Sequence, residues 1–245
     1  MIRYAVRLDR MSAALVGGGL AVFLLMALSE LVNQSDGLTS SLSPYLELLI
    51  GVAWAAPMLT REVESGSASW AWGMGVPRRS WLVARAAPLA AGCVVTGCAL
   101  GGLVMLSQVR WFPSMWQDKV TPALVASAFP SVVAFCLLSG ALGLAAAALT
   151  TRLIPAITIT FAVQVALSYA APTVAVRLAP SRVAPAAAVH SGHVLSEHTA
   201  HGIALVTYVP NSAYWPVVLI MSAFLLTLAV GLSWLAITRI ARLGD

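Results

Sequence analysis

The sequence predicts an all-α, polytopic integral membrane protein with six transmembrane helices and both termini in the cytoplasm. Three observations carry this prediction: the composition, the spacing of long apolar segments, and the distribution of arginine and lysine. Of the 245 residues, 60% are hydrophobic and only 9% are charged, whereas soluble domains contain about 25% charged residues. Such a chain cannot cover a water-facing surface, so we expect residues 1–245 to form a single transmembrane domain.

The apolar segments set the number of helices. A helix needs about 20 apolar residues to cross a hydrocarbon core about 30 Å thick. Six segments qualify, and they run Met11–Leu31, Pro44–Thr60, Leu82–Leu106, Pro122–Thr150, Leu153–Ala171 and Tyr214–Ile237. The first is longer than the apolar region of a cleaved signal peptide, so we interpret it as a retained span. The fourth contains Pro130, which predicts a kink or a break near its start because proline interrupts helical hydrogen bonding.

The basic residues orient these spans. If the N-terminus is cytoplasmic, ten of the 14 basic residues lie inside and four, Arg110, Lys119, Arg177 and Arg182, lie outside. This asymmetry follows the positive-inside rule, so the net charge of +5 indicates topology and requires no nucleic-acid partner. Residues 61–81 then form a cytoplasmic hairpin, and residues 172–213 form an extracytoplasmic loop. Arg3, Arg7 and Arg10 predict an interfacial elbow helix over residues 1–10, with plain flanking charges as the alternative.

The cytoplasmic hairpin is unusually elaborate. It lies within "APMLTREVESGSASWAWGMGVPRRSW", residues 56–81. Residues 60–73 lack proline and predict one short helix, with Glu62 and Glu64 in its first turn, where carboxylates favour the positive helix end. Trp70 and Trp72 fall towards its end, and Pro77 follows. The alternative is a solvated interfacial loop whose arginines contact anionic lipid.

This hairpin resembles the corresponding part of permease subunits of type 2 ATP-binding cassette (ABC) exporters, especially actinobacterial ones. Their pattern is Arg-Glu-x-Glu-x-Gly-[Ser/Thr], a tryptophan-bearing turn and a Pro/Ser/Arg cluster. The matching residues are Arg61, Glu62, Glu64, Gly66, Trp72, Pro77, Arg79 and Trp81. The resemblance implies a coupling helix that contacts an ATPase through Arg61, Glu62, Glu64, Gly66, Trp72 and Arg79. It also implies a smaller contact at the Thr150–Leu153 loop.

The chain has no G-x-x-x-x-G-K-[S/T] sequence, and its one lysine, Lys119, is predicted to lie outside. It therefore has no P-loop to bind ATP, and we predict no catalytic residue and no cofactor in this chain. The resemblance implies a separate cytoplasmic ATPase subunit that binds ATP and Mg, and a second permease copy as homodimer or pseudo-dimer. The implied activity is export of an amphipathic or hydrophobic drug, peptide, lipid or glycan across a bacterial plasma membrane. Arginine in place of lysine, with abundant alanine, suggests a GC-rich bacterial genome.

Few polar residues interrupt the spans. Glu30 and Glu47 lie near outer ends, where they are either solvated at the interface or line the outer mouth of a substrate path. Gln164 shares a helix face with Thr160, which favours interhelical hydrogen bonding over substrate contact. The small residues indicate close helix packing, within one chain or between two. They are Gly97 and Gly101 in the third span, and Ser139, Gly143 and Ala147 in the fourth.

All four histidines, His190, His193, His198 and His201, lie in the outer loop beside Glu197. On a helix they would form two i, i+3 pairs, and imidazole is a common metal ligand. The order is not H-E-x-x-H, and Ser191-Gly192 weakens a helix, so we favour a solvated outer cap without metal. The resemblance implies short outer helices there. A metal site would instead favour an integral membrane enzyme or a metal-dependent sensor, which is the alternative function.

Overall fold

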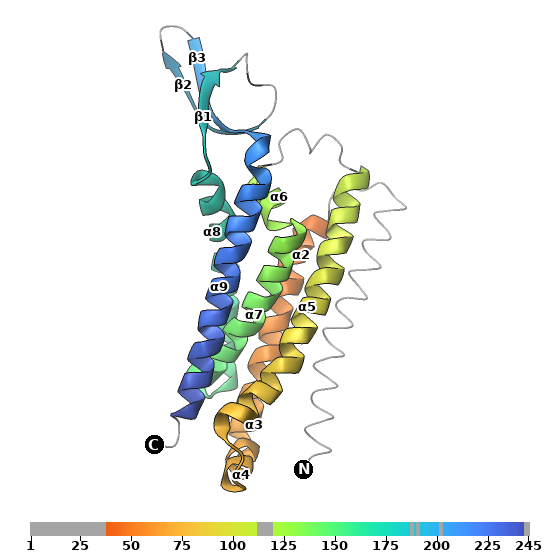
Figure 1. Cartoon of the computed structure of the whole chain (residues 1–245), viewed down its shortest axis with the longest axis vertical. Helices are drawn as coiled ribbons and strands as arrows, with labels where there is room; N and C mark the ends of the chain where they lie inside the picture. Colours follow the sequence, from red (N-terminus) through yellow and green to blue (C-terminus); the bar gives the residue numbers. More distant parts are fainter. Residues whose placement is uncertain (1–37, 112–119, 187–188, 190–191, 201–202, 243–245) are drawn as a thin grey trace.

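The computed structural model describes residues 38–111, 120–186, 189, 192–200 and 203–242. The predicted elbow helix, the first span and Glu30 lie outside these residues. Most of the described chain is helical, and a small sheet projects beyond one end of the helices (Figure 1). The elements are α2 (Leu38–Leu49), η1 (Ile50–Ala55), α3 (Ala56–Glu64), α4 (Ser67–Gly73), α5 (Arg78–Trp111), α6 (Pro122–Ala126), α7 (Phe129–Thr150), α8 (Leu153–Arg177), β1 (Arg182–Pro185), β2 (His193–Ala200), β3 (Ile203–Val209), η4 (Asn211–Ala213) and α9 (Tyr214–Ala241).

Four described helices are long and apolar enough to cross a membrane. They cover Arg78–Leu106, Phe129–Thr150, Leu153–Arg177 and Asn211–Ala241, which correspond to the last four predicted spans. The second predicted span, Pro44–Thr60, falls within α2, η1 and α3, none of which reaches the length of a span by itself. The described residues therefore confirm a helical, multi-pass membrane protein.

The second predicted segment contains a π-helical turn. The backbone stays right-handed and helical at Leu49 and Ala56, on either side of η1, so α2, η1 and α3 form a continuous helical path. Pro57 follows immediately and has no N–H to donate to the preceding turn. A proline and a π-helical turn are both known causes of local helix distortion, and this segment contains the two side by side.

The predicted break near Pro130 is also present. Residues 122–150 divide into α6 and α7, and Ala128 between them has an extended backbone. Pro130 lies in the first turn of α7, where its missing N–H costs no helical hydrogen bond. The break was therefore correctly predicted, and it separates a five-residue helix from the long one.

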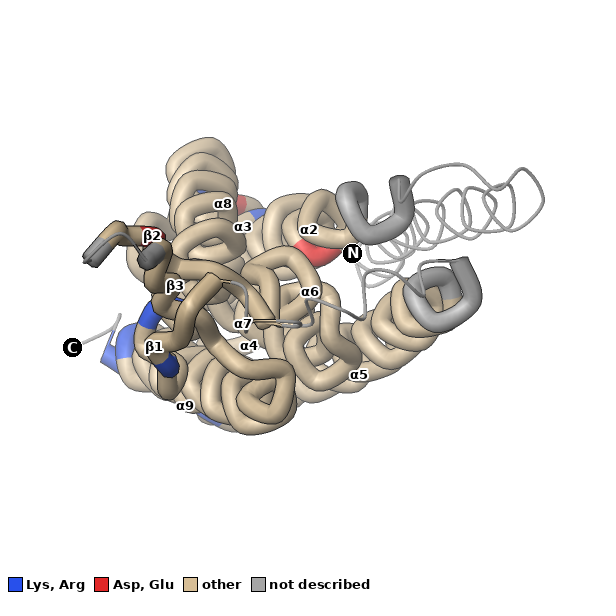
Figure 2. The backbone as a smooth tube through the Cα atoms, turned by 90° about the horizontal axis from the view of Figure 1, so that it is seen from above, with Lys and Arg blue, Asp and Glu red and all other residues tan. Residues whose placement is uncertain are grey.

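Helix α7 lies at the centre of the described bundle, with α2, α5, α8 and α9 around it (Figure 2). Close approach is possible because the facing residues are small. A Cβ built on Gly143 would lie 2.6 Å from the Cβ of Ala55, and one built on Gly97 would lie 2.9 Å from the Cα of Val133. Both predicted small-residue patterns therefore act in packing within one chain.

The connection between α8 and α9 corrects the all-α prediction. β1, β2 and β3 form an antiparallel sheet in the order β1-β3-β2, with a bulge between Val194 and Ser196. Of the short helices expected there, the described part of this connection contains a single 3₁₀ turn, η4, directly before α9. α8 extends through Arg177, beyond the predicted loop boundary at residue 172. β3 reads IALVTYV, and these β-branched and aromatic residues favour strands. The helical pairing of histidines, considered as the less favoured arrangement, does not occur, because His193 and His198 lie in β2.

Candidate functional site

The hairpin of residues 61–81 lies at the end of the bundle opposite the sheet (Figure 1). It does not form the single helix predicted over residues 60–73. α3 ends at Glu64, so Glu62 and Glu64 lie in the last turn of α3 and not in the first turn of a new helix. The chain then turns through Gly66, whose φ is +71°, and α4 begins at Ser67.

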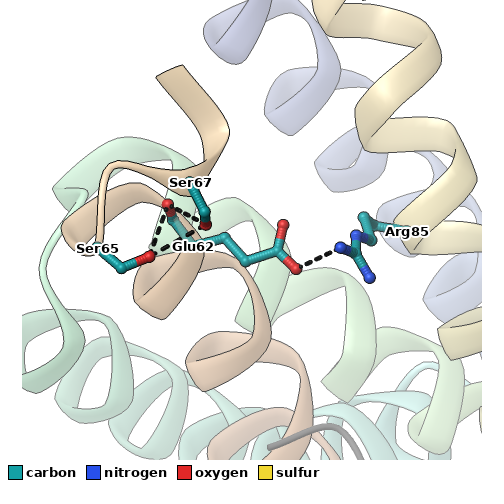
Figure 3. Close-up of polar contacts among 4 residues, drawn as sticks. All are labelled: Glu62, Ser65, Ser67 and Arg85. Carbon is teal, nitrogen blue, oxygen red and sulfur yellow. Dashed lines mark hydrogen bonds and ion pairs between the residues drawn. The ribbon is translucent and has the colours of Figure 1, made fainter. Parts of the chain in front are cut away.

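Local hydrogen bonds explain this break. Gly66 donates its N–H to the Val63 carbonyl oxygen at 3.2 Å, while Ser65 N–H bonds to the Arg61 carbonyl. A glycine in the left-handed region is a common helix terminator because it lacks a Cβ. The Ser67 hydroxyl donates to the Glu62 carbonyl at 3.1 Å, and the Ser65 hydroxyl lies 3.0 Å from the Ser67 hydroxyl (Figure 3). The sequence Ser65-Gly66-Ser67 was therefore a termination signal that the prediction did not use.

Glu62 connects the hairpin to α5. Its Oε1 lies 2.9 Å from Nη2 of Arg85 (Figure 3), and the Glu62 side chain is largely covered, with 14% of its surface exposed. Arg85 was counted in the sequence only as a charge that sets topology. Its role could have been suspected because it follows the hairpin by one turn of the third span. The ion pair fastens the end of α3 to the start of α5.

Glu64 connects the hairpin to α8. Its Oε1 accepts a hydrogen bond from the Leu153 N–H at 2.8 Å. Leu153 is the first residue of α8, and the preceding residue, Arg152, supplies no side-chain cap. The first N–H groups of a helix lack intrahelical partners, and a carboxylate there also favours the positive end of the helix dipole. The hairpin and the predicted second contact, the Thr150–Leu153 loop, are thus joined directly.

Aromatic contacts hold α4 against the beginning of α5. The rings of Trp72 and Trp81 meet edge to face, with centroids 5.5 Å apart. The Arg78 guanidinium carbon lies 4.9 Å from the centre of the Trp72 ring, a distance typical of cation–π attraction. Trp81 is buried. α4 is therefore a supported element that projects from the bundle.

The outer face of this element is partly apolar. Trp70 and Met74 are each 64% exposed, and the side chains of Arg61 and Arg79 are exposed as well. We call these four residues the α4 surface. Exposed apolar side chains and exposed arginines on the same hairpin suit contact with a protein partner or with a lipid headgroup layer.

The predicted substrate-path residues are not joined in the described structure. Glu47 on α2 and Gln164 on α8 are both buried, and no hydrogen bond links them among the described residues. Thr160 and Gln164 are both fully buried, which confirms that they share a face, but Thr160 bonds within its own helix to the Ala156 carbonyl. The interhelical bond expected for Gln164 is not observed in the described residues, where neither atom of its amide has a partner.

Two of the four histidines can be placed. His193 pairs with Val209 and His198 with Leu205 across β2 and β3, while His190 and His201 lie outside the described residues. Among the residues that the structure describes, no group of three or more His, Cys, Asp and Glu side chains is arranged to hold a metal ion. A solvated, metal-free histidine loop remains a prediction.

A multi-pass helical membrane protein with a supported hairpin at the end opposite a small sheet is the class that the fold and this site define. The chain matches a family model described as ABC-2 membrane transporter related over residues 21–177, which is more than half of its length. It therefore belongs to the ABC-2 membrane transporter related family, and the resemblance to type 2 ABC permeases is confirmed. The match covers the hairpin and α8 but not the sheet or α9. No curated protein and no solved structure matches the chain.

Proposed function

We propose that this chain is the permease subunit of an ABC exporter and that a separate cytoplasmic ATPase docks on its hairpin. Family membership implies association with an ATP-binding subunit. The observation that carries the docking site is the construction of the hairpin: the last turn of α3 is fastened through Glu62 to α5 and through Glu64 to α8, and the Ser67 hydroxyl at the start of α4 bonds to that turn. A surface held in this way can pass a displacement to the membrane helices.

The charge distribution supports a cytoplasmic location for the hairpin. Among the described residues, seven arginines lie at the hairpin end and three towards the sheet end (Figure 1). The seven are Arg61, Arg78, Arg79, Arg85, Arg152, Arg239 and Arg242. The three are Arg110, Arg177 and Arg182. Because basic residues accumulate on the cytoplasmic side, we infer six spans in a bacterial plasma membrane, with both termini inside.

The α4 surface fits the ATPase as partner. Trp70 and Met74 project from the bundle at 64% exposure, and covering them with protein removes apolar area from water. Arg61 and Arg79, which are exposed on the same hairpin, offer charge-assisted hydrogen bonds to acidic groups. ATP and Mg would be bound by that partner, and hydrolysis would occur there.

The substrate path is proposed to run between two copies of the chain along the first, second and fifth spans. α8 is the fifth span. Only 17% of its most apolar 18-residue stretch is buried within the chain, which leaves most of that stretch available to a second copy or to lipid. Glu30, Glu47 and Gln164 are the proposed polar residues of this path. The exported molecule is an amphipathic or hydrophobic drug, peptide, lipid or glycan.

The docking proposal is tested by co-expressing the chain with its cognate ATPase. The permease alone should hydrolyse no ATP, and the complex should. Gly66→Pro should abolish ATPase binding while leaving membrane insertion intact, because proline cannot adopt the positive φ of this residue. Gly73→Ala is the matched control, since no atom lies within 4 Å of a Cβ built there. Robust ATP hydrolysis by the permease alone would contradict the proposal.

The orientation is tested by cysteine labelling in a variant without native cysteines. An impermeant reagent added outside should label Ser196→Cys in β2, but not Ser67→Cys in α4 or Thr151→Cys after α7. Ser196 is exposed on the sheet, and residues 67 and 151 lie at the opposite end of the bundle (Figure 1). External labelling at position 67 would place the hairpin outside and exclude a cytoplasmic partner there.

A further inference from the structure

The two carboxylates of the hairpin hold different helices. Glu62 pairs with Arg85 on α5, and Glu64 accepts the Leu153 N–H at the start of α8. We propose that Glu64 is the positioning residue that makes α8 follow the hairpin, so that a displacement of α4 moves α8. This inference rests on the proposed function, in which a partner ATPase moves the hairpin.

The connection that precedes α8 is short and supplies no side-chain cap to the first turn of this helix. Only Thr151 and Arg152 separate α7 from α8, and Thr151 adopts a left-handed φ of 54°. Arg152, at the N-cap position, provides no side-chain acceptor. A carboxylate from a different helix therefore takes the role that a serine, threonine or aspartate usually fills locally, and the first turn of α8 is fixed to α3.

Along its length α8 is held more loosely than its neighbour. The most apolar 18-residue stretch of α8 is 17% buried, whereas that of α7 is 83% buried. The face of α8 that does pack inward carries Gln164, whose amide oxygen and nitrogen are both buried without a partner among the described residues. A buried polar group that lacks a hydrogen bond destabilises the arrangement that contains it. A shift of α8 therefore breaks no hydrogen bond between the Gln164 side chain and the described residues, and it can form new ones.

The chain of contacts is thus continuous from α4 to α8. The Ser67 hydroxyl, at the start of α4, bonds to the Glu62 carbonyl at the end of α3, and Glu64 on the same turn bonds to α8. α3 also packs directly on α8. Motion of α4 passes through the last turn of α3, where one carboxylate holds α5 and the other holds α8.

The test is hydrogen–deuterium exchange of the permease–ATPase complex in lipid nanodiscs, with and without a non-hydrolysable ATP analogue. Glu64→Ala should make the Leu153 amide exchange roughly five- to tenfold faster, because its acceptor is removed. Glu64→Gln keeps the Oε1 acceptor and should stay near wild type. Glu62→Ala removes the neighbouring carboxylate and should leave Leu153 protected. Pro155 has no amide, so few other signals overlap in this peptide.

The second measurement is the nucleotide-dependent change in exchange along α8. It should be present in the wild-type complex, retained in Glu64→Gln, and lost in Glu64→Ala although the ATPase still binds. An unchanged response of α8 in Glu64→Ala, or an unaffected Leu153 amide, would overturn the inference about Glu64 and leave the proposed function standing. Failure of the wild-type chain to bind any ATPase would overturn the proposed function, and the transmission to α8 with it.

Discussion

Helices α7 and α8 are consecutive, are joined by two residues, and are both apolar enough to cross a membrane. Yet α7 lies at the centre of the described bundle and α8 lies at its edge. The most apolar 18-residue stretch of α7 is 83% buried, and that of α8 is 17% buried. α7 is rich in small residues, including Ser139, Gly143 and the alanines at 145–148, whereas α8 exposes large ones such as Phe161 and Tyr169. Apolar character therefore identifies a span but does not determine whether it is central.

The physical reason lies in the solvent. Lipid tails are as apolar as leucine, so burial of a large apolar side chain against another helix gains little. Small residues allow backbones to approach, and the gain then comes from close packing and polar contacts. Ser139 shows both effects, because its hydroxyl accepts the Gly51 N–H at 3.0 Å in the buried contact of α7 with η1. α7 is therefore the tightly packed centre of the described bundle, and α8 is the helix whose shift we propose.

The largest expected effect is at Gly143 on α7. A Cβ there would lie 2.6 Å from the Ala55 Cβ and 2.7 Å from the Gly51 carbonyl oxygen. Gly143→Leu should therefore prevent correct packing, with a loss of stability of about 3 kcal/mol or more. Size-exclusion profile and thermal unfolding in detergent measure this. Gly231→Leu on α9 is the control, because nothing lies within 4 Å of its built Cβ.

A smaller effect is expected where α5 contacts α7. Gly97→Ala places a Cβ 2.9 Å from the Val133 Cα, while Gly102→Ala on the same helix meets nothing within 4 Å. The first change should destabilise the protein by about 1–3 kcal/mol, and the second should be neutral or stabilising by up to about 1 kcal/mol. Denaturation of both variants under one condition gives the difference. Equal stabilities would show that α7 is not packed tightly against α5.

Gln164 tests α8 in the opposite direction. Gln164→Met keeps the side-chain length and removes two buried polar atoms that lack partners among the described residues. Thermal unfolding should show a gain of about 1–2 kcal/mol, and transport should fall if α8 needs this amide in a second arrangement. Ser168→Ala, one turn further along α8, is the control. A loss of stability in Gln164→Met would mean that the amide is satisfied in the folded protein.

The smallest effect is expected on the exposed face of α8. Phe161 is 51% exposed, so Phe161→Ala should change the stability of the isolated protomer by about 0.5 kcal/mol or less. The measurement is thermal unfolding of the monomeric chain in detergent. A loss as large as that of Gly97→Ala would place this face in the core of the protomer and would remove the contrast with α7.

Much of the fold follows from local composition. About 20 consecutive apolar residues are enough to specify a span, and the four long helices coincide with predicted segments. Proline specified the break before α7, since Pro130 fits only the first turn of a helix. The position of the hairpin between the second and third apolar segments, at one end of the bundle (Figure 1), was also correctly predicted, because its charged and aromatic residues are excluded from the hydrocarbon core.

Other features depend on residues that are far apart in the chain. The contact from Glu64 to Leu153 spans 89 positions, and no local pattern specifies which helix end meets that carboxylate. The sheet required three strands to pair across a connection in which the family resemblance implied short helices. Close packing of α7 against η1 and α5 specified which span lies at the centre. Such packing requires small residues on both facing helices, so neither segment by itself determines it.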